Sequence, residues 1–405
     1  MLTERSTPVI RATLPAVGAA IEDIAGLFYR KLFAAHPDLL RDLFNRGNQA
    51  NGEQRKALAG ALAGFAGLLI EHPGARPDAM LARIAHKHAS LGITSDQYKV
   101  VHRHLFAAMA EVLGDAFTDE ATAAWDEVYW LMANALIAAE ARLYQEAGAA
   151  EGQVWRRMEI AERHRETPDA VSLVLRRADA LPTGPFRPGQ YVSVQVELAD
   201  GARQIRQYSL SAAPGRAGWR ITVKRVRGDA GPDGEVSSWL HEHARVGDVL
   251  TVSAPFGDLV LPEGDGPLLL ASAGIGATPM LAMLDHLVAT GSTRRVTVVH
   301  ADRSPADHAH KDEQRRLAGA LPTARLRLWY ENAEHAEHDA DHSDGEATVG
   351  RADVATLDLP EGLTVFLCGP LGFMRAVRKD LLRLGVPAEA IHYEVFGPDL
   401  WLGRD

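Results

Sequence analysis

The sequence predicts three domains of different fold class: an all-α domain, then an antiparallel β-barrel, then an α/β domain with a parallel sheet. Three observations predict this order. Residues 1–147 carry apolar side chains at helical spacing. Residues 152–262 contain short strand-like runs between glycine and proline turns. Residues 266–405 alternate strands with helices, which is typical of a parallel sheet.

Bulk properties limit the partners of the chain. Its 405 residues fit two to four domains, at about 100–200 residues each. A net charge of −10 argues against a nucleic-acid partner, because phosphates require a basic face. No apolar run reaches the roughly 18 residues of a membrane span, the N-terminus lacks a secretory pattern, and the single Cys368 fits a reducing compartment. We therefore expect a cytoplasmic protein without an integral-membrane partner. A monomer is also expected, although these properties do not determine the oligomeric state.

The first domain is predicted to be helical throughout, with one apolar face on each helix. The runs at helical spacing are Ile21, Ala25, Phe28, Tyr29 and Leu32; then Leu81, Ile84, Ala85 and His88; then Tyr98, Val101, Leu105 and Met109; and the long segment 125–144. His88 continues an apolar stripe. On position alone it is either a hydrogen-bonded core histidine or a metal ligand.

The predicted barrel contains the strand R-Q-Y-S-L at residues 206–210. Arg206 and Tyr208 alternate on it and therefore share one face. Arginine can hold a phosphate, and tyrosine can stack on a flat ring. An ordinary pair of surface residues would give the same pattern, so the dipeptide leaves both interpretations open.

The α/β domain places glycines where a dinucleotide would bind. Gly274 and Gly276 follow the apolar strand 268–271 and precede a helix opened by Pro279. Such glycines let the backbone approach a pyrophosphate at a helix N-terminus, although a tight turn without a ligand fits equally well. The C-G-P segment 368–370 ends a second strand of the same sheet, and ligands bind outside the carboxyl ends of such strands.

Six ordered motifs carry a resemblance: R-P-G-Q-Y, R-Q-Y-S-L, G-E-V-S-S-W-L, G-I-G-A-T-P-M, C-G-P-L-G-F-M and Y-E-V-F-G-P. They resemble the ferredoxin–NADP⁺ reductase-like superfamily, and with the helical domain the whole chain looks like a flavohaemoglobin. The resemblance implies haem b, FAD and NADH or NADPH as cofactors. It assigns FAD to Gln190, Tyr191, Arg206, Gln207, Tyr208, Ser209, Gly234, Glu235, Val236 and Ser237, with Glu394, Val395, Phe396, Gly397 and Pro398 closing over the flavin. It assigns the dinucleotide to Gly274, Ile275, Gly276, Ala277, Thr278, Pro279, Cys368, Gly369 and Pro370.

The same resemblance assigns roles in the helical domain. His88, in R-I-A-H-K-H-A-S-L-G-I, would be the proximal iron ligand, with Tyr98 and Glu140 around it. Tyr29 and Gln54 would be the distal polar residues, while Leu58 packs over the bound gas and Phe44 wedges against the haem. From the residues alone, Glu140 fits a solvated helix face equally well, and Gln54 fits a capping box with Asn51.

The implied activity is nitric oxide dioxygenation, in which NAD(P)H reduces FAD, FAD reduces the haem iron, and ferrous-oxy haem converts NO to nitrate. Two alternatives remain: a haem gas sensor or oxygen store, and a flavin reductase that serves peroxides or ferric acceptors. The choice between NADH and NADPH stays open, because Arg303 would attract a 2′-phosphate and Asp302 would repel it. The run from His335 to His342 is interpreted as a solvated loop without a metal role.

Overall fold

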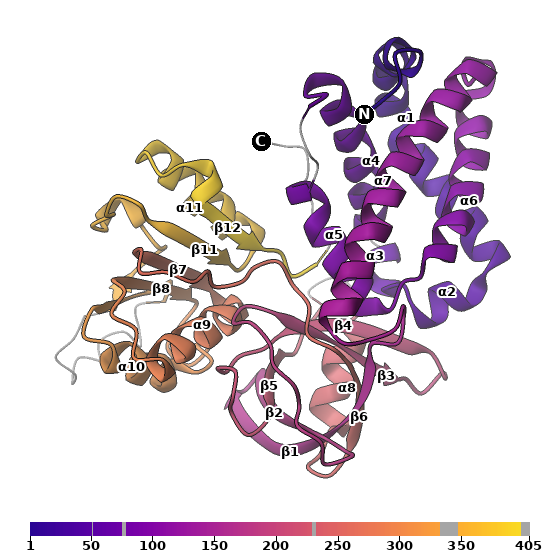
Figure 1. Cartoon of the computed structure of the whole chain (residues 1–405). Helices are drawn as coiled ribbons and strands as arrows, with labels where there is room; N and C mark the ends of the chain where they lie inside the picture. Colours follow the sequence, from indigo (N-terminus) through magenta and orange to yellow (C-terminus); the bar gives the residue numbers. More distant parts are fainter. Residues whose placement is uncertain (51, 75–77, 229–231, 333–346, 398–405) are drawn as a thin grey trace. The chain divides into compact units, whose positions relative to one another are not determined.

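The computed structural model describes residues 1–405 except 51, 75–77, 229–231, 333–346 and 398–405 (Figure 1). The chain forms two compact units. The first contains Met1–Trp155 together with Gln195–Arg206, and the second contains Arg156–Val194 with Gln207–Phe396. These units divide the chain differently from the three expected domains, so the boundaries 1–147, 152–262 and 266–405 stay a prediction.

The first unit contains the predicted all-α region. Its helices are α1 (Ser6–Ala35), α2 (Pro37–Asp42), α3 (Arg46–Ala50), α4 (Glu53–Glu71), α5 (Asp78–Leu91), α6 (Ser95–Leu113) and α7 (Asp119–Glu146). They bury one continuous apolar core that includes Ile10, Phe65, Met109 and Trp125. Burial of these large side chains is the main force that holds the helices together.

The starts of α4 and α6 differ in how they are capped. At α6, Thr94 and Gln97 form a capping box in which the Gln97 side chain accepts the Thr94 N–H at 2.9 Å. At α4 the residue before the helix is Gly52, in a left-handed conformation and without a side-chain cap. The expected alternative of a capping box through Gln54 is therefore wrong; Asn51 itself lies outside the described residues.

The β-barrel is a six-stranded sheet with the order β4-β3-β6-β1-β2-β5. Its strands are β1 (Trp155–Thr167), β2 (Ala170–Arg177), β3 (Tyr191–Glu197), β4 (Arg203–Ser209), β5 (Trp219–Lys224) and β6 (Val249–Ser253), with helix α8 (Glu235–His243) between the last two. Antiparallel pairing joins β1 to β2 and β2 to β5. A bridge from Leu210 to Ile221 connects the two edge strands and confirms the predicted barrel.

The α/β region is a parallel sheet with the order β10-β9-β8-β7-β11-β12. The strands are β7 (Leu268–Ala273), β8 (Val296–Asp302), β9 (Ala324–Tyr330), β10 (Thr348–Val349), β11 (Thr364–Cys368) and β12 (Ile391–Glu394); the helices are α9 (Ala277–Ala289), α10 (Lys311–Ala320) and α11 (Leu371–Arg383). The strand order reverses between β7 and β11. Ligands of open α/β sheets bind at such a switch point, which directs attention to the loops after these two strands.

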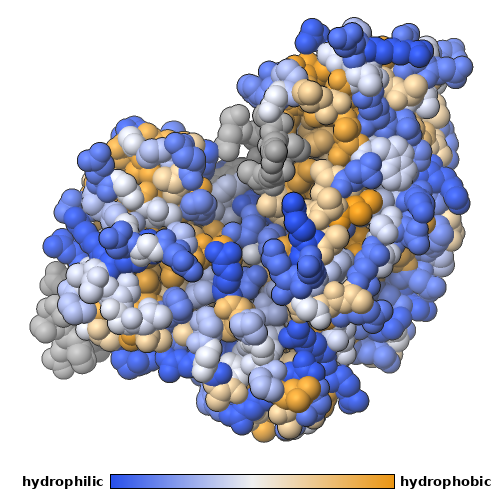
Figure 2. All heavy atoms as spheres, in the orientation of Figure 1, coloured by the Kyte–Doolittle hydropathy of each residue, from blue (hydrophilic) through white to orange (hydrophobic). Residues whose placement is uncertain are grey.

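Hydrophilic residues cover most of the face drawn in Figure 2, with smaller apolar patches among them. Among the described residues, none of the helices combines the length and apolar character that crossing a bilayer requires. The cytoplasmic location and the monomeric state stay predictions. The run from His335 to His342 lies outside the described residues.

Candidate functional site

Three helices bring together the side chains predicted around the proximal histidine. His88 on α5 bonds through Nδ1 to Glu140 Oε1 on α7 at 2.9 Å. The same nitrogen lies 2.9 Å from the hydroxyl oxygen of Tyr98 on α6. The Tyr98 hydroxyl donates to Glu140 Oε1 at 2.5 Å, which closes a triangle of polar groups.

The protonation of this triangle follows from the donors and acceptors. Glu140 is only 2% exposed, which excludes the solvated helix face that its sequence pattern left open. Because a carboxylate only accepts, His88 carries its proton on Nδ1, and Nε2 remains as the ring nitrogen that can bind a metal. Burial raises the pKa of Tyr98, and the nearby charge of Glu140 raises it further, so Tyr98 remains a donor.

Two further tyrosines of α7 were not predicted from the sequence. The Tyr129 hydroxyl donates to the backbone carbonyl of Tyr98 at 2.6 Å, and the Tyr144 hydroxyl donates to the carbonyl of Ile93 at 2.5 Å. Both share the buried face of α7 with Glu140. The spacing 129, 133, 136, 140 and 144 could have identified them, since it places all three polar residues on one helical face.

The predicted distal residues also lie in this unit. Tyr29 is 6% exposed and lies in an aromatic group with Phe33 and Phe44, whose ring centroids are 5.6 and 5.8 Å from its own. Burial raises the pKa of Tyr29, and a hydrogen bond with Gln54 opposes this only partly. Leu58 packs against the same core.

These residues fit a haem. The donor set offers one imidazole nitrogen, with the other ring nitrogen fixed by a carboxylate, as haem ligation requires. The side chain of Gln49, like that of Gln54, hydrogen-bonds the Tyr29 hydroxyl and partly opposes the rise of its pKa. Gln49 was not predicted from the sequence.

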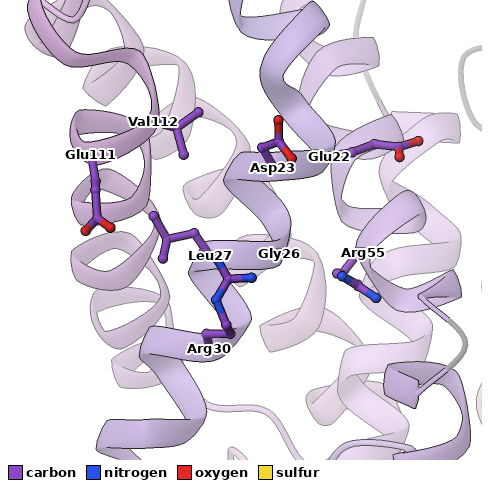
Figure 3. A pocket seen from close by; sticks show the side chains of 8 residues that line it. All are labelled: Glu22, Asp23, Gly26, Leu27, Arg30, Arg55, Glu111 and Val112. Carbon is purple, nitrogen blue, oxygen red and sulfur yellow. The ribbon is translucent and has the colours of Figure 1, made fainter.

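A hollow on the helical unit does not fit a haem. Figure 3 shows that α1, α4 and α6 line it with Glu22, Asp23, Gly26, Leu27, Arg30, Arg55, Glu111 and Val112. Five of these eight side chains are charged, and none of them was predicted as a site residue. A haem needs mostly apolar contacts, so this hollow is not its site.

The predicted flavin residues lie on β3 and β4. Tyr191 is 6% exposed, and Gly257 packs on it so closely that a Cβ would lie 3.1 Å from the ring. Arg206 donates to Asn45 Oδ1 at 2.8 Å and to the Ile205 carbonyl at 2.7 Å. These two neutral acceptors orient its guanidinium.

The remaining residues of these strands divide by face. Tyr208 is half-buried and Ser209 is buried. Gln207 points to the opposite face from Arg206 and Tyr208, and its amide donates to Ser193 Oγ at 3.0 Å. Gln190 accepts the Arg187 N–H at 2.8 Å. The flavin roles of these residues stay predictions, and for Gln207 the structure provides an internal partner instead.

Helix α8 begins at the predicted pyrophosphate turn. Gly234 precedes it, and Glu235, Val236 and Ser237 form its first turn. The Ser237 hydroxyl accepts the N–H of Val226 at 3.1 Å and donates to the Gly234 carbonyl at 3.1 Å, which fixes the turn. The free N–H groups of a helix N-terminus suit an anion.

The predicted dinucleotide site, at the turn after β7, depends on backbone packing. A Cβ on Gly276 would lie 2.3 Å from the Cys368 carbonyl oxygen and 2.7 Å from the Gly369 nitrogen, so only glycine fits. Gly274 has φ +52°, which L residues rarely adopt. Thr278 closes the turn by donating to the Ile275 carbonyl at 3.0 Å. The turn therefore brings backbone to the switch point of the sheet; Ala277 and Pro279 are buried in the first turn of α9, and Pro370 precedes α11.

Strand β12 lies beside the strand that ends at Cys368. Cys368 pairs in register with Glu394 on β12, and both are buried. Burial raises the pKa of the Cys368 thiol, and the Glu394 charge raises it further, so the thiol stays protonated. Val395 is half-buried, whereas Phe396 is 48% exposed and Gly397 is exposed. Pro398 lies outside the described residues.

Lys224, at the end of β5, was not predicted from the sequence. Its Nζ lies 3.8 Å from the position that a Cβ on Gly274 would take. Burial alone would raise the pKa of Asp302, but the neighbouring His300 imidazole, the Arg303 backbone N–H and the positive charge of Lys224 outweigh it, so the pKa is lowered. A cation beside a glycine turn suits a pyrophosphate. The V-K-R segment gave no distinctive signal.

Comparison with known proteins agrees with this geometry. A globin family model matches residues 26–136, and a model for the oxidoreductase NAD-binding domain matches residues 270–379. The fold and the site therefore define an oxidoreductase that joins a globin to a flavin and nicotinamide reductase.

The relatives are similar over nearly the full length. Flavohemoproteins of Rhizobium meliloti and Chromobacterium violaceum are 39% and 40% identical, over 99% and 98% of this chain and 100% and 98% of their own. The crystal structure of a flavohemoglobin from Malassezia yamatoensis with bound FAD and heme has a TM-score of 0.87 at 38% identity and covers 98% of this chain and 100% of that one. The chain belongs to the flavohemoprotein family. The expected cofactor set of haem, FAD and a nicotinamide dinucleotide is confirmed for this family.

Proposed function

We propose that this chain is a nitric oxide dioxygenase that uses NADH, FAD and haem to convert NO and O₂ to nitrate. The observation that carries the proposal is the hydrogen-bonded triangle of His88 with the buried side chains of Tyr98 and Glu140. A solved FAD/NAD-binding domain of a nitric oxide dioxygenase from Vibrio cholerae, 38% identical with a TM-score of 0.54, covers 60% of this chain and 99% of its own and supports it.

The triangle suits oxygen chemistry rather than storage. His88 would ligate the haem iron through Nε2, and haem supplies the binding of small gases and one-electron chemistry. Glu140 accepts the Nδ1 proton of His88 at 2.9 Å, which gives the imidazole part of the character of an imidazolate. A more basic imidazole donates more electron density to a metal. Tyr98 supports this carboxylate with a second donor.

On the distal side, the residues would orient the substrates and exclude water. Tyr29 keeps its proton, because burial raises its pKa, and its hydroxyl can therefore donate to a polar gas. Gln54 bonds with that hydroxyl and holds its orientation. Leu58 and Phe44 supply apolar walls, which keep a small apolar substrate such as NO close to the reacting position.

The reductase region would supply the electrons. FAD can accept two electrons from a nicotinamide and release them singly. Arg206, Tyr208 and the N-terminus of α8 would hold its phosphates and ring, and the Gly274–Gly276 turn would hold the pyrophosphate of the nicotinamide dinucleotide. Lys224 would add a positive charge beside that turn.

NADH is the expected reductant. Arg303 was the residue that could attract a 2′-phosphate, but its guanidinium is paired with Asp307 at 2.7 Å. Asp302, with a lowered pKa, stays ionised beside it. The Asp307 carboxylate already pairs with this guanidinium, which disfavours an additional phosphate.

Nitrate yield per NADH tests the proposal. Each conversion of NO and O₂ to nitrate takes one electron, and NADH carries two. With NO, O₂ and NADH, the purified holoprotein should therefore form two nitrates for each NADH oxidised. A sensor or oxygen store would oxidise no NADH in steady state, and a reductase that serves other acceptors would oxidise NADH without forming nitrate; either result refutes the proposal.

A further inference from the structure

His310 has an unusual backbone and an unusual environment. It precedes α10 with φ +61° and ψ 24°, a left-handed conformation that a residue with a Cβ rarely adopts. Its side chain is only 3% exposed. Strained, buried residues persist only where the surrounding structure requires them, and they concentrate at functional positions.

The His310 imidazole joins the α/β region to the barrel. Its Nε2 lies 2.8 Å from Thr222 Oγ1 on β5 and 3.3 Å from Ser172 Oγ on β2. Its Nδ1 lies 3.0 Å from Glu313 Oε2 and 3.4 Å from Glu166 Oε2. Since carboxylates only accept, Nδ1 carries the proton and Nε2 accepts from the hydroxyl of Thr222.

The bonds continue toward the strand predicted to hold the flavin. Glu313 pairs with Arg220 at 2.9 Å. Arg220 donates from Nε to Ser211 Oγ at 3.1 Å, and Ser211 Oγ also bonds Thr222 at 3.0 Å. Ser211 lies two residues after Ser209, the last residue of β4. We name His310, Glu313, Thr222, Ser172, Arg220 and Ser211 the lobe latch.

The other end of the His310 loop is fixed to the α/β region. The loop begins after Asp302, at the carboxyl end of β8. His308 lies two residues before His310, and its Nδ1 is 3.0 Å from the Tyr330 hydroxyl oxygen. Its ring also stacks on His300, with 3.9 Å between the ring centroids. The segment after β8 is thus held to the sheet by His308 and to the barrel by His310.

A second buried group joins the same two parts. Asp285 on α9 is 2% exposed and accepts the backbone N–H of Ala213 at 2.8 Å. Arg216 donates to it at 3.2 Å from Nε. Helix α9 begins at the predicted pyrophosphate turn, and Ala213 follows the predicted flavin strand. Two independent polar connections therefore hold the loops of one candidate cofactor site to those of the other.

We propose that the lobe latch, with His310 as its central residue, is a positioning device for hydride transfer: it fixes the distance between the nicotinamide and the flavin. This inference rests on the proposed function. In the step concerned, a hydride with its electron pair leaves C4 of NADH, giving NAD⁺, and joins the flavin, which also takes up a proton from solvent. Misplacement by about 1 Å can slow such a step by as much as a hundredfold. Buried polar networks of this kind define geometry more than they add stability.

The test measures the anaerobic reduction of the flavin by NADH in the holoprotein, monitored by stopped-flow absorbance. His310→Gly removes the imidazole, while glycine adopts the left-handed backbone without strain. The reduction rate constant should fall about tenfold or more, with a Kd for NADH within about threefold of the parent value. With C4-deuterated NADH, the isotope effect should persist. An unchanged rate constant, or an increase in Kd that accounts for the whole loss, would overturn the latch.

Thr222→Val provides a second variant from the barrel side. If His310 and Thr222 act through one latch, the double variant should be about as slow as the slower single variant, since coupled residues are not additive. Fully additive losses would contradict the proposal. His164→Gln is the matched control: His164 also pairs with a glutamate, Glu162 at 3.0 Å, but it is exposed and both residues lie on β1. Failure of the parent protein to reduce its flavin with NADH would instead refute the proposed function.

Discussion

The two predicted redox sites are built in different ways. The site in the helical unit depends on side chains, and the bonded pair His88 and Glu140 is separated by 52 residues in the sequence. The predicted dinucleotide site depends on close packing of the backbone, since a Cβ on Gly276 would lie 2.3 Å from the Cys368 carbonyl oxygen. The first kind of site is damaged by removing atoms and the second by adding them.

Truncation at the first site should have the largest effect. His88→Ala removes the imidazole that would bind iron, so haem content and NO consumption should both fall by more than about 100-fold. This loss is larger than the one expected when only a hydrogen-bond partner of a metal ligand is replaced. Flavin reduction by NADH should be unchanged, because it depends on the barrel and the α/β region. Haem absorbance per protein and NO consumption at an electrode measure the loss. Retained haem with normal turnover would contradict the assignment of His88.

Addition of one carbon should be most damaging at the second site. Gly276→Ala forces its Cβ against the backbone of Cys368 and Gly369, so the unfolding free energy should fall by about 3 kcal/mol or more, with loss of NADH oxidation. Gly319→Ala is the control, since Gly319 is on α10 with no atom within 4 Å of its Cβ position. That change should stabilise the helix by about 0.5–1 kcal/mol. Urea unfolding measures both; equal effects would refute the close-approach argument.

A change of charge without a change of shape tests the triangle. Glu140→Gln keeps the size of the side chain but removes the acceptor charge from His88 Nδ1. Haem should be retained, while NO turnover falls about 10–100-fold and the iron–histidine stretching frequency in resonance Raman decreases. The control, Glu111→Gln, alters a glutamate that is 59% exposed and pairs with Lys31. An unchanged stretching frequency in Glu140→Gln would show that the carboxylate does not polarise the imidazole.

The latch glutamate should contribute a pH-dependent stability. Burial alone would raise the pKa of Glu313, but His310 and Arg220 lower it from 4.5 to about 2. A carboxyl group with a depressed folded pKa stabilises the native state above 4.5, and this contribution is lost as the pH falls toward about 2. Glu313→Gln should therefore lower the unfolding free energy by about 1–3 kcal/mol at pH 7, and the deficit should shrink between these two pKa values. A deficit independent of pH would contradict this ion pairing.

The smallest effect concerns the choice of reductant. Asp307→Ala frees the guanidinium of Arg303, which is 58% exposed and now pairs with Asp307. Exposed pairs of this kind contribute at most about 1 kcal/mol, so kcat/KM for NADPH should rise by up to about fivefold while that for NADH stays the same. Steady-state kinetics with both reductants measure the ratio. A decrease for NADPH would place the 2′-phosphate elsewhere.

Sequence periodicity was sufficient for local structure and for residues that share one element. The stripe Leu81, Ile84, Ala85 and His88 predicted the orientation of His88, and the strand–glycine–helix order predicted the turn at Gly276. Both depend on short-range geometry, which a period of 2 or 3.6 residues determines. The three fold classes followed from the same periodicities.

Pairings between distant segments were not predictable in this way. Glu140 fitted a solvated face until the packing of α7 against α5 placed it beside His88, and only the family resemblance had suggested the pair. Lys224 and the latch residue His310 carried no local pattern at all, because their roles arise where loops from separate elements meet. Tyr129 and Tyr144 were visible in the spacing of α7, but nothing in the sequence indicated that their partners are backbone carbonyls.

One measurement tests the central claim, that electrons enter from a nicotinamide bound at the Gly274–Gly276 turn and leave through iron held by His88. Oxidised holoprotein is mixed with NADH without oxygen, and the flavin and haem absorbances are followed together. The account predicts that the flavin is reduced first and the haem afterwards, and that in His88→Ala the flavin phase persists without a haem phase. A haem that stays oxidised in the parent protein while its flavin is fully reduced would contradict it.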